Sequence, residues 1–141
     1  MKKILILCAL LLLIVSGCSA DNDSDVSADD LHKTQTIAVT TPDGSVLQTI
    51  TDQAAINNFV DALDLDHWEL AKPPSDASII GSFGLSQEKT IHFGEKPDDT
   101  LYDVATLTLY DTGHLRCSLS GFNITFAISD EAYNTLAAYF R

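Results

Sequence analysis

The chain has 141 residues, and 45% of them are hydrophobic, which suits one domain with a modest core. Its formal net charge at pH 7 is −12. Because nucleic-acid phosphates repel so acidic a chain, the composition excludes DNA or RNA as the main partner.

The chain begins with the order of residues typical of an exported precursor. Lys2 and Lys3 give a positive start, and an unbroken apolar run follows from Ile4 to Val15. A helix that crosses a bilayer needs about 20 apolar residues, so this run is too short to span one. It is therefore predicted to be the apolar part of a signal peptide that covers residues 1–17.

The run ends in Val15-Ser16-Gly17-Cys18, which resembles the lipobox of bacterial lipoproteins. Most members of that family have Leu where Val15 stands. The resemblance implies that Cys18 carries diacylglycerol and that the chain is cut just before it. Two acyl chains suffice for stable anchoring, so it also implies a protein held on the outer face of the cell membrane. Ser19 implies sorting to the outer membrane in an organism that has one.

An acidic tether is predicted after the lipidated cysteine. Residues 18–33 are rich in aspartate, and their only sizeable apolar side chains are Val26 and Leu31. Such a segment buries too little apolar area to offset the entropy lost on ordering, so we expect it to be flexible. Loss of two lysines with residues 1–17 takes the net charge from −12 to −14. A single domain is predicted over residues 34–141.

The domain is predicted to begin with a hairpin and a helix. Apolar residues alternate from Ile37 to Val39 and from Val46 to Ile50, on either side of the turn residues Pro42-Asp43-Gly44. Thr51 or Asp52 then caps a helix. The apolar stripe of this helix comprises Ile56, Phe59, Val60 and Leu63.

The segment around the only tryptophan has no strong periodicity. Trp68 is followed by Leu70 and by a loop around Pro73 and Pro74. Because aromatic side chains dominate binding hot spots, these four residues form a candidate binding surface. The alternative, which we favour, is that Trp68 covers the end of the core as a lid.

The rest of the chain is predicted to be mostly strands and to end in a helix. Asp111 to His114 has the residues of a tight turn between two of these strands. Ser129 is expected to cap the last helix. The strands are Ile79–Leu85, Thr90–Phe93, Val104–Tyr110, Leu115–Ser120 and Phe122–Ile128, the last with one fully apolar face, and the helical stripe comprises Tyr133, Leu136, Ala137 and Phe140.

Together these elements predict an α+β two-layer sandwich, with an antiparallel sheet of five to seven strands and two helices on one face. Ile50 to Ala54 and Ile128 to Ala132 share the order of strand, cap and helix, and whether they are a true duplication stays open. The order of elements, with a Trp before a Pro-containing loop, is similar to that of small Gram-positive lipoprotein domains of uncharacterised function. That resemblance implies a fold class and no activity.

Two motifs invite a catalytic interpretation. Asp111-Thr112-Gly113 has the letters of the aspartic protease motif, but those enzymes need two carboxylates sharing a proton, and a turn is the favoured interpretation. Cys117 is three residues from His114, which places the two side chains on opposite faces of a regular strand. With Cys18 lipidated, Cys117 has no disulfide partner and is expected to be a buried core thiol.

Metal and acid–base chemistry have weaker support. The four histidines lack the spacing of zinc ligands, and Asp21 to Asp25 begins like an EF-hand loop that lacks its Gly and Glu. We expect no metal and no cofactor. The acids that could serve as pairs are Asp64, Asp66 and Glu69, and Asp98 with Asp99; solvated surface is the favoured interpretation.

Three functions stay open. The first is a non-enzymatic, membrane-anchored domain that binds an envelope protein or a small ligand. The second is an inhibitor or immunity-type protein that meets a basic secreted enzyme through its charge. The third is a hydrolase of envelope polymer that uses Asp or Glu pairs.

Overall fold

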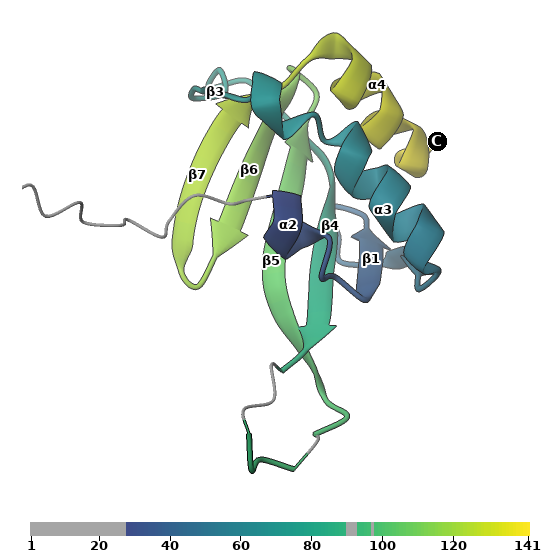
Figure 1. Ribbon diagram of the computed structural model, residues 1–141. Helices are drawn as coiled ribbons and strands as arrows, with labels where there is room; N and C mark the ends of the chain where they lie inside the picture. Colours follow the sequence, from purple (N-terminus) through teal and green to yellow (C-terminus); the bar gives the residue numbers. More distant parts are fainter. Residues whose placement is uncertain (1–27, 90–92, 97) are drawn as a thin grey trace, which may run out of the picture.

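A computed structural model describes residues 28–89, 93–96 and 98–141, which form a seven-stranded sheet and its helices (Figure 1). The strand order is β2-β1-β4-β5-β6-β7-β3, and every pair is antiparallel. The elements are α2 (Ala28–Leu31), β1 (Thr36–Thr40), β2 (Val46–Ile50), α3 (Gln53–Ala62), the 3-10 helix η1 (Leu65–His67), β3 (Glu69–Leu70), β4 (Ile79–Glu88), β5 (Leu101–Tyr110), β6 (His114–Leu119), β7 (Phe122–Ala127), α4 (Asp130–Ala137) and the 3-10 helix η2 (Ala138–Phe140).

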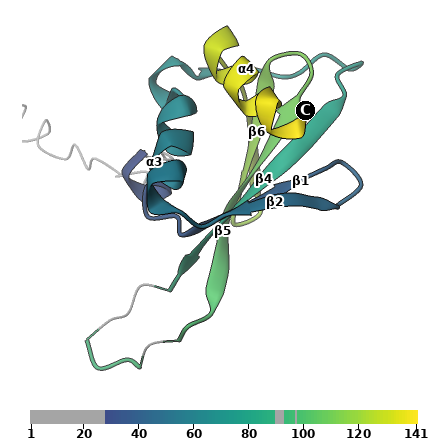
Figure 2. The same cartoon turned by 90° about the vertical axis from the view of Figure 1, so that its right-hand side faces the viewer.

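Helices α3 and α4 lie on one face of the sheet, which confirms the α+β two-layer architecture (Figure 2). Both predicted caps are present. The Asp52 carboxylate accepts a hydrogen bond from the Ala55 N–H at 2.9 Å, and the Ser129 hydroxyl accepts one from the Ala132 N–H at 3.2 Å. Each cap satisfies a backbone N–H that has no partner within its helix.

The core is an aromatic cluster between the helices and the middle strands. Phe59 of α3 packs on Phe83 of β4, with ring centroids 4.8 Å apart, and Phe140 lies 5.2 Å from Phe83. Gly81 of β4 makes room for the Phe140 ring, because a Cβ there would lie 2.1 Å from Phe140 Cε1. All four residues of the first predicted helical stripe are buried: Ile56, Phe59, Val60 and Leu63.

The prediction of a tether as far as residue 33 is wrong at its end. Residues Ala28–Leu31 form the short helix α2, and the Leu31 side chain is 1% exposed within the core. Full burial of a leucine contributes about 1.5–3 kcal/mol, which offsets part of the entropy cost of ordering one helical turn. The signal peptide, the lipobox with Cys18, and residues 18–27 of the tether lie outside the described residues.

Strands β4 and β5 are longer than predicted and extend as a two-stranded ribbon past the other strands (Figure 1). Their pairing continues to Glu88 opposite Leu101. Polar side chains predominate in this ribbon, so its sequence lacks the apolar alternation that indicates a strand. The predicted strand Thr90–Phe93 cannot be compared, because residues 90–92 lie outside the described residues; Phe93 lies in a turn.

Candidate binding surface

The apolar face of β7 is only partly covered. Phe122, Ile124 and Phe126 lie opposite Leu119, Cys117 and Leu115 of β6, so they share the face on which the helices pack. The predicted apolar face is thus present. It is buried along only part of its length, however.

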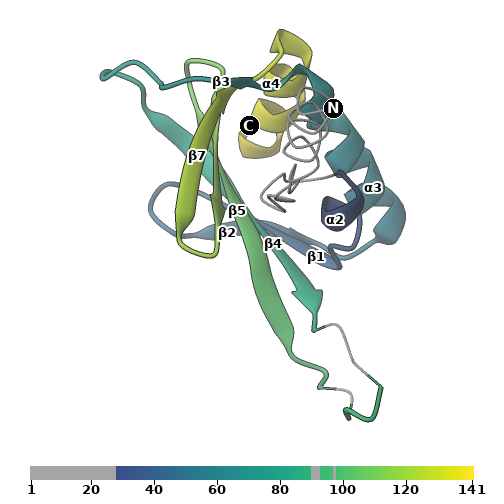
Figure 3. The ribbon, with the colours of Figure 1, turned by 60° about the vertical axis from the view of Figure 1, so that its left-hand side comes forward.

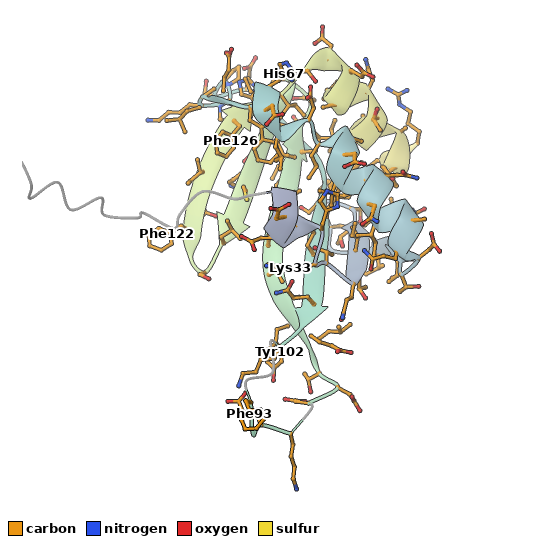
Figure 4. All side chains as sticks on the ribbon, in the orientation of Figure 1. Lys33, His67, Phe93, Tyr102, Phe122 and Phe126 are labelled. Carbon is orange, nitrogen blue, oxygen red and sulfur yellow. The ribbon has the colours of Figure 1, made fainter. Side chains whose placement is uncertain are left out.

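The side chains near the start of β7 are in solvent. Phe122 is 74% exposed and Ile124 is 37% exposed, because α3 and α4 lie over other strands (Figure 1). Figure 4 shows Phe122 projecting from the lower end of β7, with Phe126 near its upper end. Leu70 of β3, opposite Phe126, is 79% exposed on the same face. We call Leu70, Phe122 and Ile124 the apolar edge.

Trp68 forms the lid that we favoured and also borders the apolar edge. Its indole N–H donates a hydrogen bond to the Leu63 carbonyl oxygen at 2.7 Å. Its ring packs on Phe126, with centroids 4.9 Å apart. Trp68 is therefore a half-buried support, and the exposed apolar side chain beside it is Leu70; of the two prolines, Pro74 is also exposed.

The two prolines end β3 and leave the outer edge of β7 open. The Ala71 N–H donates to the Thr125 carbonyl oxygen at 3.1 Å, and the chain then enters Lys72-Pro73-Pro74 and turns away (Figure 3). Proline has no N–H with which to continue a ladder. Among the described strands, none pairs with the outer side of β7 at residues 122–124. Pro73 and Pro74 thus act by shaping this edge.

The segment that borders the apolar edge is acidic. Residues 64–76 contain one lysine, Lys72, and four acids: Asp64, Asp66, Glu69 and Asp76. With histidine neutral, this segment has a formal charge of −3. A partner that approaches from this side meets negative potential.

Asp64 connects this segment to the cap of α4. Its backbone is left-handed, with φ 53°. Its carboxylate lies 2.6 Å from His67 Nδ1 and accepts a hydrogen bond from the Ser129 hydroxyl at 3.0 Å. The hydrogen bond with His67, followed by that from Ser129, lowers the pKa of Asp64, and the same contact raises the pKa of His67. This three-residue contact was missed in the sequence.

The motifs with a possible catalytic meaning have structural roles. Asp111-Thr112-Gly113 is the β5–β6 turn, as predicted; Gly113 has φ 73°, and the Asp111 carboxylate accepts a hydrogen bond from the Ser78 N–H at 2.9 Å. Cys117 is 2% exposed in the core, which confirms the predicted buried thiol, and burial raises its pKa to about 11. His114 contacts Thr112 instead.

Asp64 and Asp98, two of the acids considered for hydrolysis, have pKa values shifted in the direction opposite to that of a general acid. The hydrogen bonds from Thr100 and then Tyr102 lower the pKa of Asp98, and that of Asp64 is also lowered. A catalytic acid near neutral pH needs a raised pKa. Within the described ranges, no three His, Cys, Asp or Glu side chains converge as metal ligands. The described part of the chain also has no helix long and apolar enough to cross a bilayer.

Comparisons with known proteins found no relative. No protein-family model matches the chain, and neither a curated protein nor a solved structure matches it. The functional argument therefore rests on the surface itself.

Proposed function

We propose that this chain is the precursor of a lipoprotein anchored on the outer face of a membrane through Cys18. The order of positive start, apolar run, small residues and cysteine supports this proposal. The aspartates that follow Cys18 also support it, since anionic lipids and polymers repel them and hold the domain away from the anchor.

The anchor is tested by mass spectrometry of the protein purified from membranes of its native cells. The expected mass is that of residues 18–141 with a diacylglycerol on the sulfur. Cys18→Ser should be found in the soluble extracytoplasmic fraction. An intact Met1 or an unmodified Cys18 in the native protein would contradict the proposal.

We further propose that the domain acts by binding another envelope protein through the apolar edge. The observation that carries this proposal is the exposure of Leu70 and Phe122 beside a free strand edge. Exposed apolar groups with a polar rim mark interaction sites on soluble domains. Acids flank the apolar edge. Burial of its side chains would therefore supply affinity, and the negative charge around it would select the partner.

The binding role is tested by affinity capture from envelope extract. The double variant Leu70→Ser, Phe122→Ser should lose the captured partner. Leu47→Ser is the matched control, because Leu47 is a 51% exposed leucine on the opposite edge strand, β2. Equal capture by all three proteins would exclude the apolar edge as the binding surface.

A second candidate function is inhibition of a basic secreted enzyme, in the manner of an immunity protein. The charge of −14 without the signal peptide and the acidic rim favour it. Association would then be fast and would weaken as salt is added. An affinity that does not change with salt would exclude this candidate and leave the binding role.

A further inference from the structure

The main-chain groups of β7 alternate between two sides. The strand pairs with β6 residue by residue, without a bulge, so N–H and C=O groups of successive residues point alternately toward and away from β6. The Thr125 carbonyl oxygen points away, since it accepts from Ala71 of the β3 side. Asn123 is two residues earlier and therefore presents its N–H and C=O on the same outer side. No described strand pairs with it there.

Side chains beside this position can recognise an incoming strand. Phe122 and Ile124 flank Asn123 on the helix-covered face, and Leu70 stands next to Phe126 on that face. The Asn123 side chain lies on the other face, where Ser118 donates to its Oδ1 at 2.5 Å. An extended segment beside β7, in line with β3, would pair with the Asn123 main chain and bury alternate apolar side chains against the apolar edge.

The opposite edge of the sheet does not offer the same template. Strand β2 also exposes apolar side chains, Val46 and Leu47. Its pairing with β1 is interrupted, however, because Val39 lies opposite Gln48 and Thr40 opposite Val46, which leaves Leu47 in a bulge. Bulges twist an edge and block further pairing. The regular free edge of the described sheet is that of β7.

Charge identifies the kind of segment that fits. The neighbouring residues 64–76 have a formal charge of −3. A second copy of this chain would bring the same acids to the edge, and residues 19–27 contribute three aspartates and no cation. The negative charge of residues 64–76 repels a second copy and residues 19–27, whereas it attracts a segment that contains lysine or arginine.

We propose that a partner protein adds an extended, lysine- or arginine-bearing segment to the outer edge of β7 as a β-strand. This inference rests on the proposed binding role of the apolar edge and names its partner class. The added strand pairs with only a short part of β7. Its main-chain hydrogen bonds therefore fix the register, and its contacts with Phe122 and Leu70 supply most of the affinity.

The test uses the mature chain with Cys18→Ser, which retains every described residue. The probe is a blocked heptapeptide that alternates lysine with valine. We expect it to bind, and we expect hydrogen exchange of the Asn123 amide to slow in the complex. Asn123→Pro removes an outward N–H, which an edge strand tolerates, together with the side chain that accepts from Ser118, and should weaken binding by about tenfold. Asn123→Ala keeps the N–H and should bind as wild type.

A second ligand separates strand addition from side-chain binding. The same heptapeptide with alternate N-methyl groups cannot pair and should not bind, which keeps the test decisive even if Asn123→Pro fails to fold. If the methylated peptide binds equally and only Phe122→Ser weakens binding, strand addition is wrong and the binding role stands. Absence of binding at millimolar peptide, or protection that maps to β2, would also overturn strand addition. Dimerisation of this protein through β7 would also overturn strand addition by a partner.

Discussion

Cys117 faces the core from β6, and burial raises the pKa of its thiol to about 11. Because the thiolate is the reactive form, we expect Cys117 to react very slowly with an aromatic disulfide reagent near neutral pH. In the mature chain with Cys18→Ser, reaction should become fast once urea unfolds the protein. Fast reaction in the folded state would contradict the burial of this side chain.

The contact between Asp64 and His67 predicts a pH-dependent contribution to stability. The folded pKa of His67 is raised above its ordinary value of 6.5, chiefly by the hydrogen bond with Asp64. The contribution is therefore fully present below that value and is lost as pH rises through the higher folded pKa. The difference in urea midpoint between wild type and His67→Gln should be larger at about pH 5 than at about pH 9. A difference independent of pH would contradict the contact.

Single residues were predictable where the partner lies within one turn of chain. Asp52 and Ser129 each accept a hydrogen bond from the N–H three residues later in the chain, so the spacing in the sequence predicts both caps. The contact of Asp64 with Ser129 joins positions 65 residues apart and needs a left-handed backbone at Asp64. Only the folded chain brings these two side chains together.

At the scale of elements, α2 is predicted to be part of the folded domain. Leu31→Ala should lower the free energy of unfolding by about 2–5 kcal/mol, because it removes a fully buried side chain from the core. Asp29→Ala in the same short helix is the control, since Asp29 is exposed. Equal urea midpoints for the two variants would show that α2 belongs to the tether.

The Phe140 ring packs closely against the backbone of β4 at Gly81. In Gly81→Ala the new Cβ would lie 2.1 Å from Phe140 Cε1, so overpacking should cost about 1–3 kcal/mol of unfolding free energy. Gly84→Ala in the same strand is the control, because its nearest neighbours are Ala38 atoms at 4.0 Å. Thermal unfolding measures both. Similar melting temperatures for the two variants would contradict the position of the Phe140 ring.

The type of each helix and strand was easier to predict than its length or its burial. Alternation in Phe122–Ile128 indicated which face of the strand is apolar, and the structure has that face. Alternation cannot show how far the helices reach across a sheet, so the exposure of Phe122 was not predictable. Strand β3 has two residues, too few for a period, and only its pairing with β7 defines it.

At the scale of the whole molecule, the sheet has two unlike edges. One ends in the bulged strand β2, and the other ends in β7, regular and only partly covered by β3. Acids border the second edge, and the lipid anchor proposed at Cys18 would keep the domain at a membrane surface. These features together support the proposal that this protein engages an envelope partner at β7.

Photo-crosslinking in living cells would detect an envelope partner bound at β7. A photoreactive phenylalanine analogue replaces Phe122 in one strain and Leu47 in another, since both side chains are exposed at sheet edges. If a partner docks at β7, position 122 should give a discrete adduct with one envelope protein, which is lost when Asn123→Pro is added, and position 47 should give none. No adduct at position 122, or equal adducts at both positions, would contradict the proposal.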